Sequence, residues 1–489
     1  MASEENQYLL IDGDDTAPET PVSPSKSIIA VLLNPITLFC ISLNFFGGNT
    51  FGVNMSAWSG AKEMYNSWHI EITPLMDEIA TSSVVGGAFV GVIISSFLAS
   101  TLGRKWTTFA GGVVATLASV ASAVTHYYYV IVVVRFFVGV GVGMTSNTVT
   151  MYVSELIDPR VRGFVTSLFQ VCVTIGILLS YVVSFLTVPH TLWWVAMAFT
   201  AIFPLGVAVV TVFMPESPKF KEGKASKKNK TKNSTDVSVS GDSSSVSLVD
   251  TFKNYPLPIF ICTVLAVGQQ LTGINVMIMY APDVLKMAGF SGSTATLVGS
   301  VGIGVFNFLA TLVGLPLSDK LGRKPLLLFG YAVIVISTLA AAVGFGVMQL
   351  SELTIFSWFS HLVVPAGVLI IVAILFFLLG FEVGPGPLFF VLLGEICPME
   401  VKGRLMAYGM GLQWICNLII ALFFLSVAEV IGKALTFGIF TVVGVAAYIC
   451  LLLFTPETRG RDLAEIHKTM RRSNVSAPAA IDEDENLIV

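Results

Sequence analysis

The chain has 489 residues, of which 54% are hydrophobic and only 12% are charged, and its formal net charge is −4. Soluble domains carry about 25% charged residues, so the composition excludes a soluble globular protein. The six cysteines form no Cys or Cys/His cluster, and the basic stretches lack stacking aromatics, so neither a metal centre nor a nucleic-acid surface is indicated. We expect an integral membrane protein that is not an enzyme and needs no cofactor.

Apolar stretches long enough to cross a bilayer, which takes about 20 residues, recur between residues 33 and 455. A polar linker at 214–256 separates two sets of six, so we predict an all-α membrane protein with bundles at 33–213 and 257–455 and tails at 1–32 and 456–489. The predicted spans are 33–57, 82–102, 107–124, 128–150, 164–187, 192–213, 257–281, 293–314, 324–347, 361–390, 403–428 and 432–455.

Most of the 27 basic residues fall in the tails, the linker and alternate connections between spans. Lys and Arg accumulate in cytoplasmic loops, so both termini are predicted to be cytoplasmic. We expect the plasma membrane as the location. Segments 5–10 and 483–488 each place an acidic residue (Glu5, Glu483) before a pair of Leu or Leu and Ile. Sorting adaptors read such patterns, which keeps an endosomal or lysosomal membrane as the alternative.

Three marks recur in the same order in both halves: LGRK at 102–105 and 321–324, an acidic segment at 155–163 and 395–403, and Pro-Glu at 215 and 456. Duplicated six-helix halves are typical of transporters that alternate access around a central site. The charges can pair across the halves and hold an inner gate shut, or serve only as orientation charges and helix caps. The candidate gate residues are Arg104, Glu155, Arg162, Glu216, Asp319, Arg323, Glu395, Arg404 and Glu457.

The seventh span contains the sequence QQLTGIN at 269–275. Amides donate and accept hydrogen bonds, as the hydroxyls of a sugar require, and Gly273 allows the helix to unwind between them. In the tenth span Gly384, Pro385, Gly386 and Pro387 allow a bend, which makes this helix a candidate gate. The alternative is that these polar residues only hold neighbouring helices together.

From about residue 36 to 462 the sequence resembles the sugar porter family of the major facilitator superfamily. The resemblance rests on QQLTGIN, FEVGPGP at 381–387, QWICN at 413–417, PETRG at 456–460, and Arg135 placed 20 residues before Glu155. It implies two pseudo-symmetric six-helix bundles and a sugar as cargo, and it implies that Tyr280 helps to close the outer side. The residues that match the family's sugar site are Gln170, Gln269, Gln270, Asn275, Asn307, Glu382, Trp414 and Asn417.

Coupling to protons depends on one position in the first span. Proton-coupled sugar porters resemble this chain but have an acidic residue there, which we align with Asn49, partnered by the arginine that matches Arg135. An amide does not titrate in the physiological range. We therefore predict uniport of a hexose, most simply D-glucose. The alternatives are a proton-coupled porter of a sugar or polyol and, in a different class, a sensor that binds sugar without transporting it.

Overall fold

The structure is a computed structural model that describes residues 31–65, 72–158, 160–222, 224, 253–351, 362–398 and 401–459. Within these residues 12 helical segments are long and apolar enough to cross a membrane, which confirms the predicted number. The chain is thus a multi-pass, all-helical membrane protein. The two sorting segments at 5–10 and 483–488 and most of the predicted linker lie outside the described residues.

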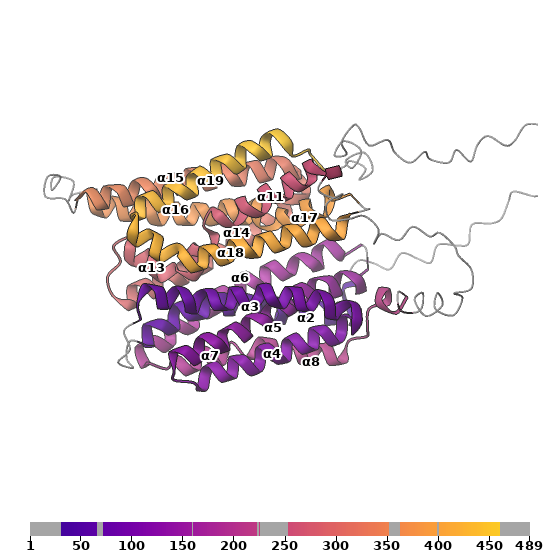
Figure 1. The fold of residues 1–489 in the computed structure, drawn as a ribbon. Coiled ribbons are helices and arrows are strands. Elements are labelled where there is room, and N and C mark those ends of the chain that lie inside the picture. The colour runs from indigo at the N-terminus through magenta and orange to yellow at the C-terminus, as the bar shows by residue number, and fades with distance from the viewer. Residues whose placement is uncertain are drawn as a thin grey trace, which may run out of the picture.

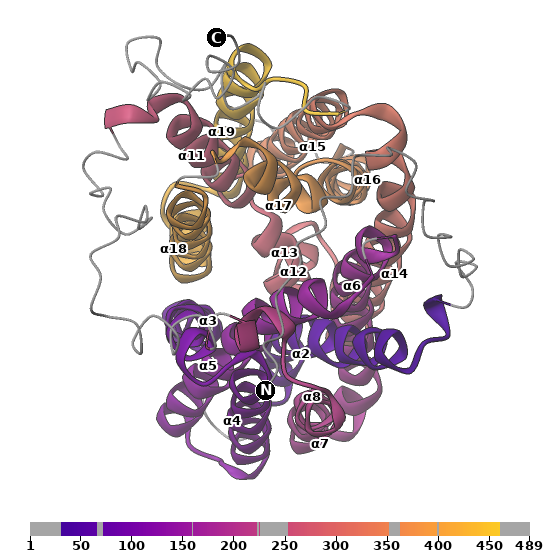
Figure 2. The ribbon, with the colours of Figure 1, turned by 90° about the vertical axis from the view of Figure 1, so that its right-hand side faces the viewer.

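The first six spans form one bundle, drawn from indigo to magenta in Figure 1, and the last six form a second bundle beside it. The end view in Figure 2 shows the two bundles on opposite sides, and α6 packs on α14 and α3 on α18 where they meet. The first half consists of α2 (Pro35–Tyr65), α3 (Pro74–Thr101), α4 (Arg104–Val124), α5 (Tyr128–Leu156), α6 (Arg162–Thr187), η2 (Val188–His190), α7 (Trp193–Phe199) and α8 (Ile202–Phe213). The second half consists of α11 (Pro256–Leu271), α12 (Ile274–Met279), α13 (Ala281–Met287), α14 (Ser293–Leu321), α15 (Arg323–Ser351), α16 (Val363–Val383), α17 (Pro385–Ile396), α18 (Lys402–Val430) and α19 (Lys433–Phe454).

Glycines bring helices within the first half into backbone contact. A Cβ added to Gly143 of α5 would lie 2.0 Å from the carbonyl oxygen of Ala88 in α3, and one on Gly52 of α2 would lie 2.0 Å from that of Val173 in α6. Small residues permit this close approach, which membrane helices use because no hydrophobic driving force joins them in lipid. These contacts make α3 with α5, and α2 with α6, closely packed pairs.

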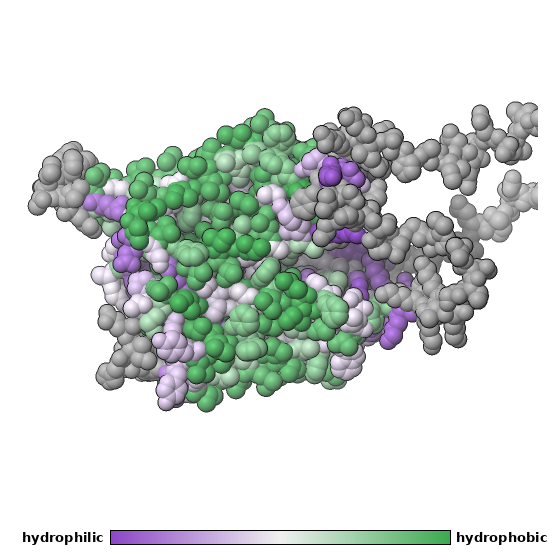
Figure 3. Space-filling model, viewed as in Figure 1, coloured by the Kyte–Doolittle hydropathy of each residue, from purple (hydrophilic) through white to green (hydrophobic). Residues whose placement is uncertain are grey.

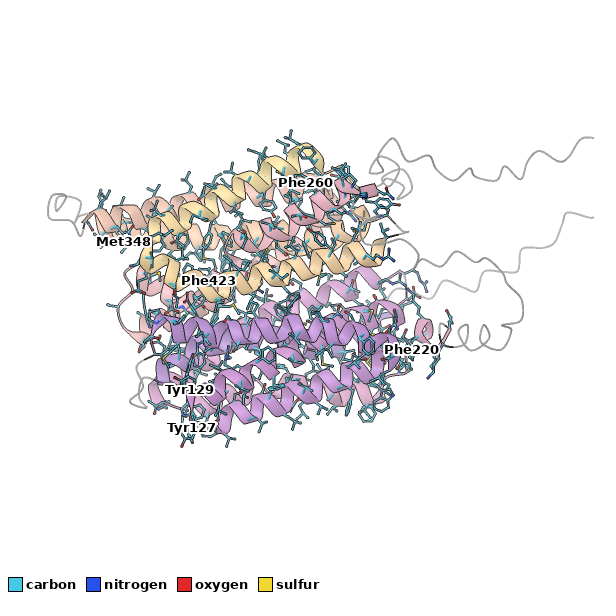
Figure 4. All side chains as sticks on the ribbon, in the orientation of Figure 1. Tyr127, Tyr129, Phe220, Phe260, Met348 and Phe423 are labelled. Atoms are coloured by element: carbon cyan, nitrogen blue, oxygen red, sulfur yellow. The ribbon has the colours of Figure 1, made fainter. Side chains whose placement is uncertain are left out.

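The outer surface of the bundles is apolar over its middle, as the green band in Figure 3 shows. Phe423 on α18 is 51% exposed and points away from the bundle (Figure 4). Tyr127 and Tyr129 lie near one end of the first half and Phe220 near the other (Figure 4). Apolar side chains in the middle with aromatic residues toward the ends fit a bilayer and its two interfaces.

The second span begins earlier than the sequence predicts, at Pro74 rather than residue 82. The added turns contain Asp77 and Glu78, which are buried. Asp77 accepts a hydrogen bond from Lys62 at 2.5 Å, and Glu78 accepts one from the backbone N–H of Ser426 in the other half at 2.7 Å. The sequence pattern missed these turns because their charges are compensated by residues distant in the chain.

Candidate functional site

The seventh span is broken where Gly273 was expected to allow unwinding. Gly273 has a φ of +100°, a left-handed conformation that glycine adopts without strain, and it separates α11 from α12. Gln270 at the end of α11 and Asn275 at the start of α12 therefore come together, and the Asn275 amide donates to the Gln270 side-chain oxygen. Two of the predicted sugar ligands are in direct contact.

The tenth span is also broken, between Val383 at the end of α16 and Pro385 at the start of α17. The side-chain amide of Gln269 donates to the Pro385 carbonyl oxygen at 3.1 Å. Its oxygen accepts a hydrogen bond from Gln413 of α18 at 2.7 Å and another from Gln270 at 3.4 Å. The breaks in the seventh and tenth spans are thereby joined through one side chain.

Gln413 was not among the residues predicted for the site. It precedes Trp414 in QWICN, and a second glutamine beside a predicted aromatic ligand is the signal that could have found it. Phe51 of α2 was missed as well, and its ring centroid lies 6.1 Å from that of Trp414. An apolar ring in the first span carries no polar pattern, so only the fold identifies it.

Contacts between the two halves cross the centre of the molecule. The Gln170 amide on α6 lies 3.4 Å from a carboxylate oxygen of Glu382 on α16, and the Phe51 and Trp414 rings approach each other from opposite halves. These residues place the candidate site at the interface that a rocking motion of the halves would open and close.

Several buried polar atoms of this region make no hydrogen bond within the described residues. They are both amide atoms of Asn307, the indole nitrogen of Trp414 and the side-chain oxygen of Asn417. The three residues are 1%, 6% and 6% exposed. Most buried polar groups are paired, and an unpaired one costs about 1–3 kcal/mol. A ligand rich in hydroxyl groups can accept hydrogen bonds from the Trp414 and Asn307 nitrogens and donate to the Asn307 and Asn417 oxygens.

The charged marks of the first half meet at one end of the bundle, which we call the predicted cytoplasmic end. The Arg104 guanidinium pairs with Glu155 at 3.0 Å, and Glu216 accepts from the backbone N–H of Arg104 at 3.0 Å and of Lys105 at 3.1 Å. We expected such charges to pair across the halves, but these pairs lie within one half. The reason is that the start of α4, the end of α5 and the segment after α8 are neighbours in the same bundle.

The second half repeats the arrangement. Arg323 lies 3.5 Å from Glu395, and Glu457 accepts from the backbone N–H of Arg323 at 3.0 Å and of Lys324 at 3.1 Å. Burial acts to raise the pKa of Glu457, but backbone N–H donors from Arg459, Arg323 and Lys324 outweigh it and hold this pKa below its usual value. Glu216 thus caps the start of α4, and Glu457 caps the start of α15.

The remaining predicted gate residues differ in their burial. Arg162 is exposed, Arg404 is half-buried, and the side chain of Asp319 lies outside the described residues. Tyr280 is fully buried, and its hydroxyl donates to the Ala421 carbonyl oxygen. The residues Gly384, Pro385, Gly386 and Pro387 lie at the α16 to α17 break.

The structure does not bring Asn49 and Arg135 together. The Asn49 amide donates to the Phe45 carbonyl oxygen of its own helix, whereas the Arg135 guanidinium lies 5.1 Å from the ring centre of Trp58. Trp58 is nine residues further along α2, or about 13 Å of helix. The amide of α2 that shares a face with Trp58 is Asn54, one turn before it, and the assignment of Asn49 to the coupling position stays a prediction.

The sequence profile of the family described as "Sugar (and other) transporter" matches residues 38–470. This chain belongs to the sugar transporter family. The galactose-proton symporter of Escherichia coli (strain K12) is 29% identical to this family member over 89% of this chain and 95% of its own. The glucose transporter GlcP of Staphylococcus epidermidis is 29% identical over 88% of this chain and 96% of its own.

Solved structures place this sugar transporter in the major facilitator fold. A structure described as the proton:xylose symporter of that superfamily bound to 6-bromo-6-deoxy-D-glucose matches with a TM-score of 0.69, at 23% identity, over 88% of this chain and 99% of the other. The all-helical fold with two six-helix halves is thereby confirmed. Family members are transporters rather than enzymes, and the cargo class is sugar.

Proposed function

We propose that this sugar transporter moves a hexose, most simply D-glucose, by facilitated diffusion with alternating access. The observation that carries the proposal is the set of neutral amides at the interface of the halves, together with the unpaired buried atoms of Asn307, Trp414 and Asn417. Each neutral hydrogen bond contributes on the order of 1 kcal/mol, so binding would be weak enough for release.

The surroundings of Arg135 support transport without proton coupling. Its Nε donates to the Ala80 carbonyl oxygen at 2.8 Å and its guanidinium stacks over Trp58. The residues of α2 one turn before and one turn after Trp58 are Asn54 and Lys62, neither of which is a carboxyl group, and Asn54 donates to the Thr50 carbonyl oxygen. An amide cannot carry a proton across the membrane.

A second candidate is proton-coupled transport of a sugar or polyol. The similarity to a galactose-proton symporter favours it. A carboxyl group that could titrate is also present at the candidate site, since Glu382 is 2% exposed and faces Gln170. A sensor that binds without transporting has no feature of the described residues in its favour. We propose the plasma membrane as the location, with an endosomal or lysosomal membrane, reached through sorting adaptors, as the alternative.

Uptake of radiolabelled D-glucose into proteoliposomes separates the two candidates. With facilitated diffusion, labelled sugar equilibrates to the outside concentration at the same rate with and without a proton gradient. Accumulation above that concentration, driven by protons, would establish the second candidate instead. D-galactose and D-xylose, tested as competitors, report which sugar the site prefers.

Introducing a carboxyl group beside Arg135 is expected to make transport sensitive to pH. Asn54→Asp places an ionisable group one turn from Trp58, where Arg135 would hold it charged at neutral pH and acid would discharge it. The ratio of uptake rates at pH 5.5 and pH 7.5 should move away from that of the natural protein. Asn49→Asp is the matched control, because Asn49 lies nine residues before Trp58, over which Arg135 lies. This variant should not change the ratio of uptake rates. If the Asn54→Asp variant has the same ratio as the natural protein, Asn54 is not the residue of α2 that acts with Arg135.

A further inference from the structure

Three charged residues from both halves meet at the outer end of the bundle, opposite the predicted cytoplasmic end. Lys62 of α2 lies 2.5 Å from Asp77 of α3 in its own half and also binds Asp283 of α13 in the other half. The side chains of Lys62 and Asp77 are 8% and 7% exposed, and that of Asp283 is 18% exposed. The second contact exists only while the halves are closed at this end.

Lys62 is fixed in place by its surroundings. Its ammonium lies 5.8 Å from the ring centre of Tyr280, and Trp58 donates to Asp77 at 2.6 Å. The Tyr181 hydroxyl of the first half donates to the Ile278 carbonyl oxygen of the second. The cluster is therefore part of a closed contact between the two halves, at the base of an outer cavity that these three charged residues line.

The three-residue cluster has one positive and two negative side chains. Lys62 is one ammonium between two carboxylates, and taking a charge out of water is costly unless a partner compensates it. The other charged or titratable side chains on the helices packed here are Glu63, Glu78, Tyr128, Arg135, Tyr280, Lys286, Glu429 and Lys433. Lys286 pairs with Glu63 at the rim, with 41% of the lysine side chain exposed, and Glu78 is bound by Ser426.

We propose that Lys62 is the residue that allows the outer gate to close, by compensating Asp77 and Asp283, one carboxylate from each half, that would otherwise repel each other. The inference rests on the proposed alternating access but adds a residue that no motif indicated. It assigns the two partners unequal roles: the lysine is required for closure, whereas the negative charge of Asp283 is not.

Counting the charges of Lys62, Asp77 and Asp283 predicts which substitution opens the outer gate. Removing the Lys62 charge leaves two facing carboxylates and favours the open outer gate. Removing the Asp283 charge leaves Lys62 and Asp77 as a neutral pair and keeps the gate closed. Consistent with this, burial raises the pKa of Asp283, and repulsion from Asp77 adds to it against the opposing attraction of Lys62. Because its pKa is raised in the closed state, external acid should favour closure.

Labelling of a reporter cysteine tests the proposal directly. Ala428 lines the outer cavity of about 400 Å³ and is 5% exposed, so Ala428→Cys is shielded when the gate is closed. Cells expressing the full chain are treated with a membrane-impermeant maleimide, and labelling above that of the protein without the reporter is followed over time. We expect Lys62→Met to raise the labelling rate roughly tenfold or more, Asp283→Asn to leave it unchanged or lower it, and the double variant to fall between them.

Lys286→Met is the matched control, because it removes the other lysine that bridges the halves at this end. That pair is partly exposed and contributes little, so the rate should stay within about twofold. Equal increases from Lys62→Met and Asp283→Asn, or no increase from Lys62→Met, would overturn the proposal. If Lys62→Met does not reach the surface, the double variant and Asp283→Asn still decide, because an increase from Asp283→Asn alone contradicts the charge count. The assay needs no sugar, so failed uptake leaves its result intact.

Discussion

Replacing Gln270 with alanine is expected to reduce sugar uptake at low concentration by at least roughly tenfold. The variant loses an amide that faces the candidate site and also leaves the Asn275 amide, which donates to it, without its acceptor. Asn275 is half-buried, so its unsatisfied donor and the lost contact to sugar together cost about 1–3 kcal/mol, and tenfold corresponds to about 1.4 kcal/mol. Initial rates in proteoliposomes that contain equal amounts of protein measure the effect.

The control for Gln270→Ala is an amide truncation of the same kind elsewhere in a span. Asn147 of α5 donates to the Ser95 hydroxyl at 2.9 Å and is distant in sequence from every predicted sugar ligand except Gln170. Asn147→Ala should change the uptake rate by less than about twofold. Unchanged uptake by Gln270→Ala, with the protein correctly folded, would remove the amide cluster from the transport site.

Placing valine at Gly143 is expected to prevent folding altogether. The Cβ of any larger residue would lie 2.0 Å from the Ala88 carbonyl oxygen, 2.7 Å from its carbonyl carbon and 2.8 Å from its Cα, so α3 and α5 would have to separate. Overpacking costs about 1–3 kcal/mol even where side chains can adjust, and here the obstacle is backbone. The yield of monodisperse protein in detergent should fall to a small fraction of the natural yield.

The same substitution at Gly438 of α19 is the control, since a Cβ there meets no atom within 4 Å. Both variants add the same β-branched side chain to a helix interior, so they share any propensity cost. A good yield from both would show that α3 and α5 are less closely packed than described. Poor yields from both would point to propensity rather than contact as the cause.

The number of spans, the internal repeat and the two broken helices could be predicted because each leaves a local pattern. Apolar runs of about 20 residues identify spans, and Gly273 and the segment at 384–387 identify breaks through backbone chemistry alone. The amides at 269–275 followed from the hydrogen-bonding needs of a sugar and the full set of candidate sugar residues from a resemblance, and the structure adds Gln413 and Phe51 beside them. Those two lack a local signal strong enough to separate them from ordinary helix-packing residues.

The predictions that failed depended on partners distant in the chain. Because Asp77 and Glu78 are charged, the sequence pattern placed them outside the second span. In the structure Lys62 and Ser426 bind them within α3. Asn49 and Asn54 are both amides in one helix, and only the position of Arg135 over Trp58 distinguishes their levels. Several charged marks at the helix ends do pair, but their sequence order could not show which helix ends are neighbours.

The self-contained charge clusters bear on how the protein is made. Arg104, Glu155 and Glu216 all precede α11, so the ribosome has delivered every member of the first cluster before the second half is synthesised. N-terminal domains generally fold first during translation. The charge cluster at the predicted cytoplasmic end of the first half is thus complete before the second half is made, whereas buried Glu78 still awaits Ser426 of α18. Two fragments translated from separate messages and divided within residues 225–252 would each insert with a complete cluster and could then assemble with each other.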